Sequence, residues 1–248
     1  RDTVLSWQSP AGWTLAGLML VGAIRLLVSS IIVQRKLRRA VPITSGPVRR
    51  TLDQLLGRHG IRHAVRLRAT ASAEPAALGI RRWTILVPHD LSQRVTCEEI
   101  EALLAHELAH LVRRDPVWMG IVRGMICLMP WQPLHRLLRR GWVETAEQLC
   151  DDWTGAAGVP PLTLARCLTQ VAEWKLVPTV AGMTAVGREK GRLTRRVLRL
   201  TNRSDCDSRS RRPHRLGVPV VMEVSAVLLV YCAPRIEATT GAESEATT

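Results

Sequence analysis

The sequence lacks several residue types on which common protein sites depend. It has no phenylalanine, and Tyr231 is the single tyrosine among 248 residues. Because Tyr231 lies in a late apolar run, a tyrosine that stabilises an oxyanion is not expected. The six cysteines are scattered without a CxxC pair, which argues against a disulfide framework and against a zinc site built from cysteines. Free thiols of this kind fit a reducing compartment.

Lysine is also scarce, so the net charge of +14 comes almost wholly from arginine. Such a charge is typical of proteins that bind nucleic acid or anionic membranes, and of cytoplasmic loops of membrane proteins. Its placement favours the last of these. Residues 34–70 hold ten Lys/Arg and residues 188–215 hold eleven, and the two basic blocks lie between two apolar runs.

The first apolar run, residues 12–33, carries the single charge Arg25 and has about the ~20 residues needed to cross a bilayer. The basic stretch QRKLRR follows it directly, which is a stop-transfer pattern and not a signal peptide. The sequence therefore predicts a transmembrane helix here. The second run, residues 216–233, is shorter and carries Pro219 and Glu223. It is expected to span as well, with a buried helix as the alternative.

The positive-inside rule then assigns a side to each remaining part of the chain. Residues 34–215 are expected to be cytoplasmic, and a stub over residues 1–11 is expected to be external. The polar tail over residues 234–248 is expected to be external and disordered. The predicted organisation is therefore one domain flanked by transmembrane helices.

That domain is predicted to be α+β. Pro47 begins a helical pattern that ends near Gly57 and Gly60, so a helix is expected over residues 47–58. Alternating residues predict a strand over 65–70, and a short apolar run closed by Pro88 predicts another over 84–87. A further strand over 75–80 would suit an edge because Pro75 cannot donate a hydrogen bond. The remainder is expected to be helical, including a buried or membrane-facing helix over 117–129.

The strongest motif is His-Glu-Leu-Ala-His at residues 106–110. Thr96 and Glu99 form a capping-box pattern before it, and the helix is expected to end at Asp115-Pro116. His106 and His110 lie one turn apart on the same face, so both rings can reach one zinc ion. Glu107 can then lie beside the metal and take a proton from water there. A chance match inside a buried helix is the alternative, and the cap and periodicity argue against it.

A catalytic zinc needs a third protein ligand, which residues 141–158 can supply. Glu147 and Asp151 lie one turn apart in this helical stretch. One carboxylate could bind zinc while the other orients a ligand histidine through its second ring nitrogen. Glu144 lies on the same face, and spacing alone does not choose between Glu144 and Glu147. Cys150 shares the face too, but a small buried side chain is the better interpretation.

Several stretches of the sequence resemble those of a known family. The stretch HELAHLVRRDP at 106–116 resembles the HELAHxxRRD signature of the BlaR/MecR-type membrane metallopeptidases. EQLCDD at 147–152 is similar to that family's E-x-A-C-D block, with Leu149 in place of alanine. Residues 74–88 resemble its strand pair, and residues 182–200 resemble its closing helix. The resemblance covers about residues 12–202.

The resemblance implies zinc as the cofactor, with His106, His110 and Glu147 as its ligands. It implies two catalytic residues: Glu107 as the general base, and Asp151 as the carboxylate that orients a ligand histidine. The implied fold is a gluzincin-type metallopeptidase domain, mostly helical with a short sheet. Its edge strand, near residues 77–79, would hold an extended peptide substrate by backbone pairing.

The resemblance also implies a biological setting, a regulatory zinc metalloendopeptidase in the bacterial inner membrane with a cytoplasmic catalytic domain. Relatives act in signal transduction by cleaving themselves or a cytoplasmic transcriptional repressor, and a homo-oligomer is an open expectation. Two features depart from the pattern. Gln132-Pro133 replaces the usual Asn-Pro, and this sequence has no penicillin-binding domain after residue 233. The sensing of β-lactams is therefore not implied.

Two alternatives remain. A membrane quality-control metallopeptidase of the HtpX or CAAX-protease kind would share the zinc helix, although Cys150 and the RRDP stretch favour the BlaR/MecR type. A non-enzymatic, membrane-anchored module could bind nucleic acid or anionic lipid through the basic blocks. Nucleic acid is the weaker partner, because membrane topology already explains the charge. Of the histidines outside the motif, His135 is the best candidate for a helper near the zinc.

Overall fold

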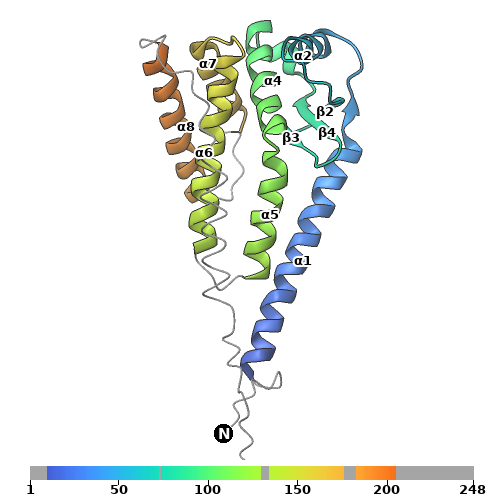
Figure 1. The fold of residues 1–248 in the computed structure, drawn as a ribbon, viewed down its shortest axis with the longest axis vertical. Coiled ribbons are helices and arrows are strands. Elements are labelled where there is room, and N and C mark those ends of the chain that lie inside the picture. Colours follow the sequence, from blue (N-terminus) through green and yellow to red (C-terminus); the bar gives the residue numbers. More distant parts are fainter. Residues whose placement is uncertain (1–9, 73, 130–133, 176–182, 205–248) are drawn as a thin grey trace, which may run out of the picture. The chain divides into compact units, whose positions relative to one another are not determined.

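The computed structural model describes residues 10–72, 74–129, 134–175 and 183–204, and this part of the chain is mostly helical with one small sheet (Figure 1). The α+β prediction is therefore confirmed. The described helices are α1 Pro10–Arg39, α2 Pro47–Arg58, α3 Leu91–Arg94, α4 Cys97–Val112, α5 Asp115–Leu128, α6 Leu134–Ala156, α7 Pro161–Lys175 and α8 Met183–Ser204. The strands are β1 Val41–Pro42, β2 Val65–Thr70, β3 Ala76–Leu78 and β4 Trp83–Pro88. The apolar run over 216–233 and the tail over 234–248 lie outside the described residues.

Helix α1 is long and apolar enough to cross a membrane. An 18-residue window of its segment Ala16–Arg39 has a mean hydropathy of 2.2, and only 6% of that window is buried, so most apolar side chains there face outward. It packs against α5, and the crossing is close because a Cβ at Gly22 would overlap the Cys127 carbonyl oxygen. Nη1 of Arg123 also donates to Oγ of Ser29 at 3.0 Å. The run over 117–129 therefore forms a helix, as expected, and this helix packs along the candidate membrane helix.

The sheet has the strand order β1-β2-β4-β3. The predicted strands over 65–70, 75–80 and 84–87 are all confirmed, with Ala76–Leu78 at an edge. β2 and β4 pair in parallel, whereas β3 turns back antiparallel to β4 with Ala77 opposite Ile85. Gly79 allows this return, because its φ of 111° lies in the region that glycine adopts most easily. The two-residue β1 is an addition to the prediction.

Helix α4 lies at the centre of the domain, between the strands on one side and α6 and α7 on the other (Figure 1). Eleven of its 16 residues are buried. Leu104 and Leu108 are fully buried among the side chains of α2, β4 and α7, in one core cluster. Burial on nearly all sides fixes the orientation of the helix, and therefore the direction in which its histidines point.

The N-terminus of α4 forms as predicted. Oγ1 of Thr96 accepts a hydrogen bond from the backbone N–H of Glu99, and the Glu99 carboxylate accepts one from the backbone N–H of Thr96. The other end differs slightly from the prediction, because the helix stops at Val112. Arg114 then adopts a left-handed conformation with φ 59°, and a new helix, α5, starts at Asp115 with Pro116 in its first turn. Proline is tolerated there because its missing N–H has no partner to lose.

Candidate metal centre

Helices α4 and α6 bring three candidate ligands together. The rings of His106 and His110 lie with centroids 4.9 Å apart and nearly perpendicular planes. Glu147 of α6 faces both: its Oε2 lies 3.4 Å from Nε2 of His106, and its Oε1 lies 3.9 Å from Nε2 of His110. One nitrogen from each ring and one carboxylate oxygen all lie within 4.8 Å of one another. We call His106, His110 and Glu147 the ligand cluster.

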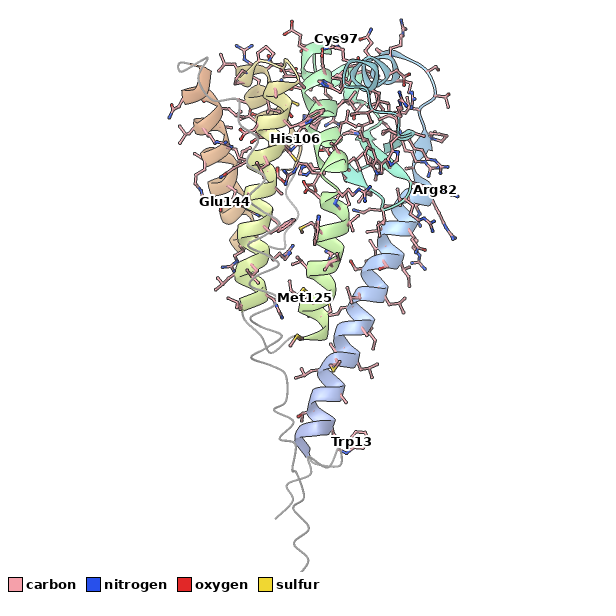
Figure 2. All side chains as sticks on the ribbon, viewed as in Figure 1. Trp13, Arg82, Cys97, His106, Met125 and Glu144 are labelled. Atoms are coloured by element: carbon pink, nitrogen blue, oxygen red, sulfur yellow. The ribbon has the colours of Figure 1, made fainter. Side chains whose placement is uncertain are left out.

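Glu144 does not join this cluster. Its carboxylate accepts a hydrogen bond from Arg195 of α8 at 2.7 Å, and both side chains are well exposed. Figure 2 shows His106 between α4 and α6, whereas Glu144 lies on the side of α6 toward α8. Of the two carboxylates that spacing left equal, Glu147 is the one that lies beside the histidines.

The donor set of the ligand cluster fits a zinc ion. Two imidazoles and one carboxylate are a common protein ligand set of catalytic zinc sites, which keep a fourth position for water or substrate. His106 is 4% exposed, while His110 and Glu147 are partly accessible, so the donors are shielded without being sealed from solvent. The pKa of Glu147 supports the same conclusion. Burial alone would raise it, but hydrogen bonding to His106 and the charge of Arg196 lower the pKa to about 2. Glu147 is thus a carboxylate at neutral pH, as a metal ligand must be.

The surroundings of His106 come from distant parts of the chain. Its Nδ1 lies 3.3 Å from Oδ1 of Asp151, although the direction of approach leaves this nitrogen without a well-aligned hydrogen bond. Burial lowers the pKa of His106, but the neighbouring carboxylates of Asp151 and Glu147 outweigh it and raise the pKa to about 9. Arg196 of α8 completes this side, with Nη2 at 3.4 Å from Nε2 of His106.

The surroundings of His110 come mainly from the adjoining turn, with a further contact from α6. Its Nδ1 lies 2.9 Å from Oδ2 of Asp115, which is also 3.3 Å from Nε of Arg113. Although burial opposes it, hydrogen bonding to His110 and the charge of Arg113 lower the pKa of Asp115. Cys150 lies on this same side, 3.3 Å from Nδ1 of His110, and its thiol donates to Oδ2 of Asp115. Cys150 faces the ring nitrogen opposite the cluster, and it is fully buried, which agrees with its interpretation as a small buried residue.

Glu107 lies between the two histidines in the sequence. It is buried, with 8% of its surface exposed. Burial raises its pKa, and the histidine charges only partly offset this effect. A carboxylate with a raised pKa is suited to accept and return a proton near neutral pH. The helix therefore presents two candidate ligands and one candidate base from five consecutive residues.

Sequence reasoning did not identify Asp115 or Arg196 as parts of this arrangement. Asp115 could have been predicted from sequence, because it follows His110 by only five residues in the RRDP stretch. Arg196 had no such signal, since it lies 45 residues beyond Asp151 on another helix. His135, the expected helper, is buried in α6 but precedes Glu147 by 12 residues, or about 18 Å along a helix at 1.5 Å per residue. It is therefore not a neighbour of the cluster.

Comparison with known proteins adds one finding to this geometry. The protein-family model described as BlaR1 peptidase M56 matches residues 9–154, which is more than half of the chain. The matched segment runs from α1 to near the end of α6, so it contains the ligand cluster, Glu107 and Asp151. A search of curated proteins found no match.

Proposed function

This chain belongs to the BlaR1 peptidase M56 family of metallopeptidases, and from that membership and the ligand cluster we propose that it is a zinc metalloendopeptidase. The main support for this proposal is that three donor atoms from α4 and α6 lie within 4.8 Å of one another, with the buried Glu107 next to His106 in the sequence. Agreement of the family with the resemblance noted in the sequence also disfavours the HtpX or CAAX-protease alternative.

In this proposal His106, His110 and Glu147 hold the zinc. When bound there, zinc would lower the pKa of water and polarise the carbonyl of the peptide to be cut. Glu107 takes the proton of the attacking water and passes it to the departing amine, which its raised pKa permits. Asp151 and Asp115 orient the rings of His106 and His110 through their Nδ1 atoms.

The substrate is proposed to be a protein segment in extended conformation. Among the described strands β3 lies at an edge of the sheet, paired with β4, and it packs next to α4. An extended peptide could add to its outer edge through backbone hydrogen bonds, which would place that peptide alongside the helix that carries Glu107. This is the edge near residues 77–79 expected from the sequence.

The setting is proposed to be regulatory proteolysis at the cytoplasmic face of the bacterial inner membrane. Helix α1 would anchor the domain, and the arginine-rich residues that follow it favour a cytoplasmic location. The chain itself, or a cytoplasmic transcriptional repressor, would be the target, as the family resemblance implies. We also propose that the chain can form a homo-oligomer, as expected from the sequence analysis.

The direct test is the substitution Glu107→Gln in the detergent-solubilised full chain. It should retain zinc and lower cleavage of labelled casein, or of the chain itself, by about 10²–10⁴-fold, since a general base contributes this much. Glu101→Gln is the matched control, because Glu101 lies on the same helix but pairs with Arg58 at the surface. Unchanged cleavage by Glu107→Gln would contradict the proposed mechanism.

A further inference from the structure

We propose that Arg196 is a positioning residue of the zinc centre, which fixes Glu147 and Asp151 from helix α8. The inference rests on the proposed function, because it assumes that the ligand cluster binds zinc. It concerns a part of the chain beyond residue 154, outside the segment that matches the family. Arg196 would act through other side chains and would not contact the substrate.

Arg196 contacts both carboxylates of the site at once. Its Nη1 lies 2.6 Å from Oε2 of Glu147. Its Nε and Nη2 donate to the two oxygens of Asp151 at 3.0 and 2.7 Å. A guanidinium group is planar and rigid, so a two-point contact sets the angle of a carboxylate as well as its distance. The arrangement therefore fixes the orientation of Asp151 through both of its oxygens and holds Glu147 through one oxygen.

Burial makes these contacts specific. The Arg196 side chain is 16% exposed and that of Asp151 is 1% exposed. A buried carboxylate without a partner is costly, so Asp151 needs a cation or hydrogen-bond donors on its oxygens wherever it lies. The pair with Arg196 meets that need in one geometry only. Asp151 is then held opposite Nδ1 of His106, and Glu147 is held opposite Nε2.

A neighbouring pair shows what is particular to Arg196. Arg199 lies about one turn further along α8 and donates to both oxygens of Asp152, each at 2.9 Å. This second pair also joins α8 to α6, and it also uses both carboxylate oxygens. It differs in that Asp152 does not belong to the ligand cluster and the pair is about one-third exposed. Arg199 therefore provides a control for the loss of an ion pair between these two helices.

The experiment compares Arg196→Ala, Arg196→Lys and Arg199→Ala in the full chain, with zinc affinity measured by chelator competition. Loss of a side chain that orients a metal ligand typically costs about 10–100-fold in metal affinity, and we expect a loss of this size for Arg196→Ala. Arg196→Lys keeps the charge but loses the planar contact, so its affinity should lie between those of Arg196→Ala and wild type. Arg199→Ala should bind zinc within about twofold of wild type, since Asp152 orients no ligand.

Thermal unfolding of the zinc-free variants separates positioning from simple stabilisation. Both alanine variants lose a contact between α6 and α8, so both should unfold at lower temperature, whereas only Arg196→Ala should lose zinc affinity. Equal or tighter zinc binding by Arg196→Ala would overturn the inference, as would an equal loss in Arg199→Ala. If Arg196→Ala does not fold, wild-type affinity in Arg196→Lys would overturn it. A wild-type chain that binds no zinc would overturn the proposed function too, which distinguishes the two failures.

Discussion

The two histidines of helix α4 are supported in opposite ways. His110 contacts Asp115, which follows it by five residues at the junction of α4 and α5. His106 contacts Asp151 of α6 and also Arg196 of α8, which lies 90 residues away in sequence. One ring is therefore oriented by the adjoining turn, and the other by the packing of two distant helices.

The difference indicates which parts of the site depend on the whole fold. The contact of His110 can form as soon as the turn at Arg114 and Asp115 is made, because short loops close with little loss of entropy. The contact of His106 requires α6 and α8 to pack against α4. Changes in α8 should therefore alter the site on the side of His106 first, whereas changes in α6 reach both histidines, because Glu147 and Cys150 also lie beside His110.

The largest effect expected on the His110 side is that of Asp115→Asn. This substitution keeps the shape of the buried side chain but removes the charge that faces Nδ1 of His110, so zinc affinity should fall by about 10–100-fold. The measurement is chelator competition, with Asp53→Asn as the control because Asp53 pairs with Arg49 on the exposed side of α2. Wild-type zinc affinity in Asp115→Asn would mean that the local contact does not support the ligand.

A pH effect is expected on the His106 side. In the zinc-free folded chain the pKa of His106 is raised from 6.5 to about 9, so the ring is protonated at neutral pH. This protonation stabilises the zinc-free fold fully below pH 6.5, and the contribution is lost as pH rises through 9. Zinc must displace the same proton, so zinc affinity should rise by about tenfold per pH unit between pH 7 and 8.

Affinity measured at both pH values tests this expectation, and Asp151→Asn should flatten the rise because it removes the carboxylate that holds the proton. Asp152→Asn, one residue away, should keep it. An affinity that does not change with pH in the wild-type chain would show that His106 is already neutral there.

The smallest effect is expected from Thr96→Ala, which should lower the stability of helix α4 without favouring either histidine. Loss of the capping box should lower the free energy of unfolding by about 1 kcal/mol, with zinc affinity of the folded chain unchanged. Denaturant unfolding of the solubilised chain is the measurement. Thr51→Ala in α2 is the control, because its hydroxyl donates to the Pro47 carbonyl of its own helix. A change in zinc affinity for Thr96→Ala would show that the cap also orients the ligands.

The parts of this protein that were predictable from sequence are those with local causes. The capping box at Thr96 and Glu99, the strand over residues 65–70 and the histidine pair all follow from patterns within a few residues. The parallel pairing of β2 with β4 and the position of Arg196 do not, because they arise from the packing of elements far apart in sequence. Glu147 lies between these cases: its helix was predictable, but spacing alone did not choose it over Glu144, because its place beside the histidines depends on how α6 packs against α4.

The most direct test of the zinc centre is the zinc content of purified wild-type chain beside Glu147→Ala and Glu144→Ala. We predict that the wild type and Glu144→Ala retain zinc, since Glu144 pairs with Arg195 at the surface, and that Glu147→Ala loses it. Zinc retained in Glu147→Ala and lost in Glu144→Ala would contradict the proposed ligands.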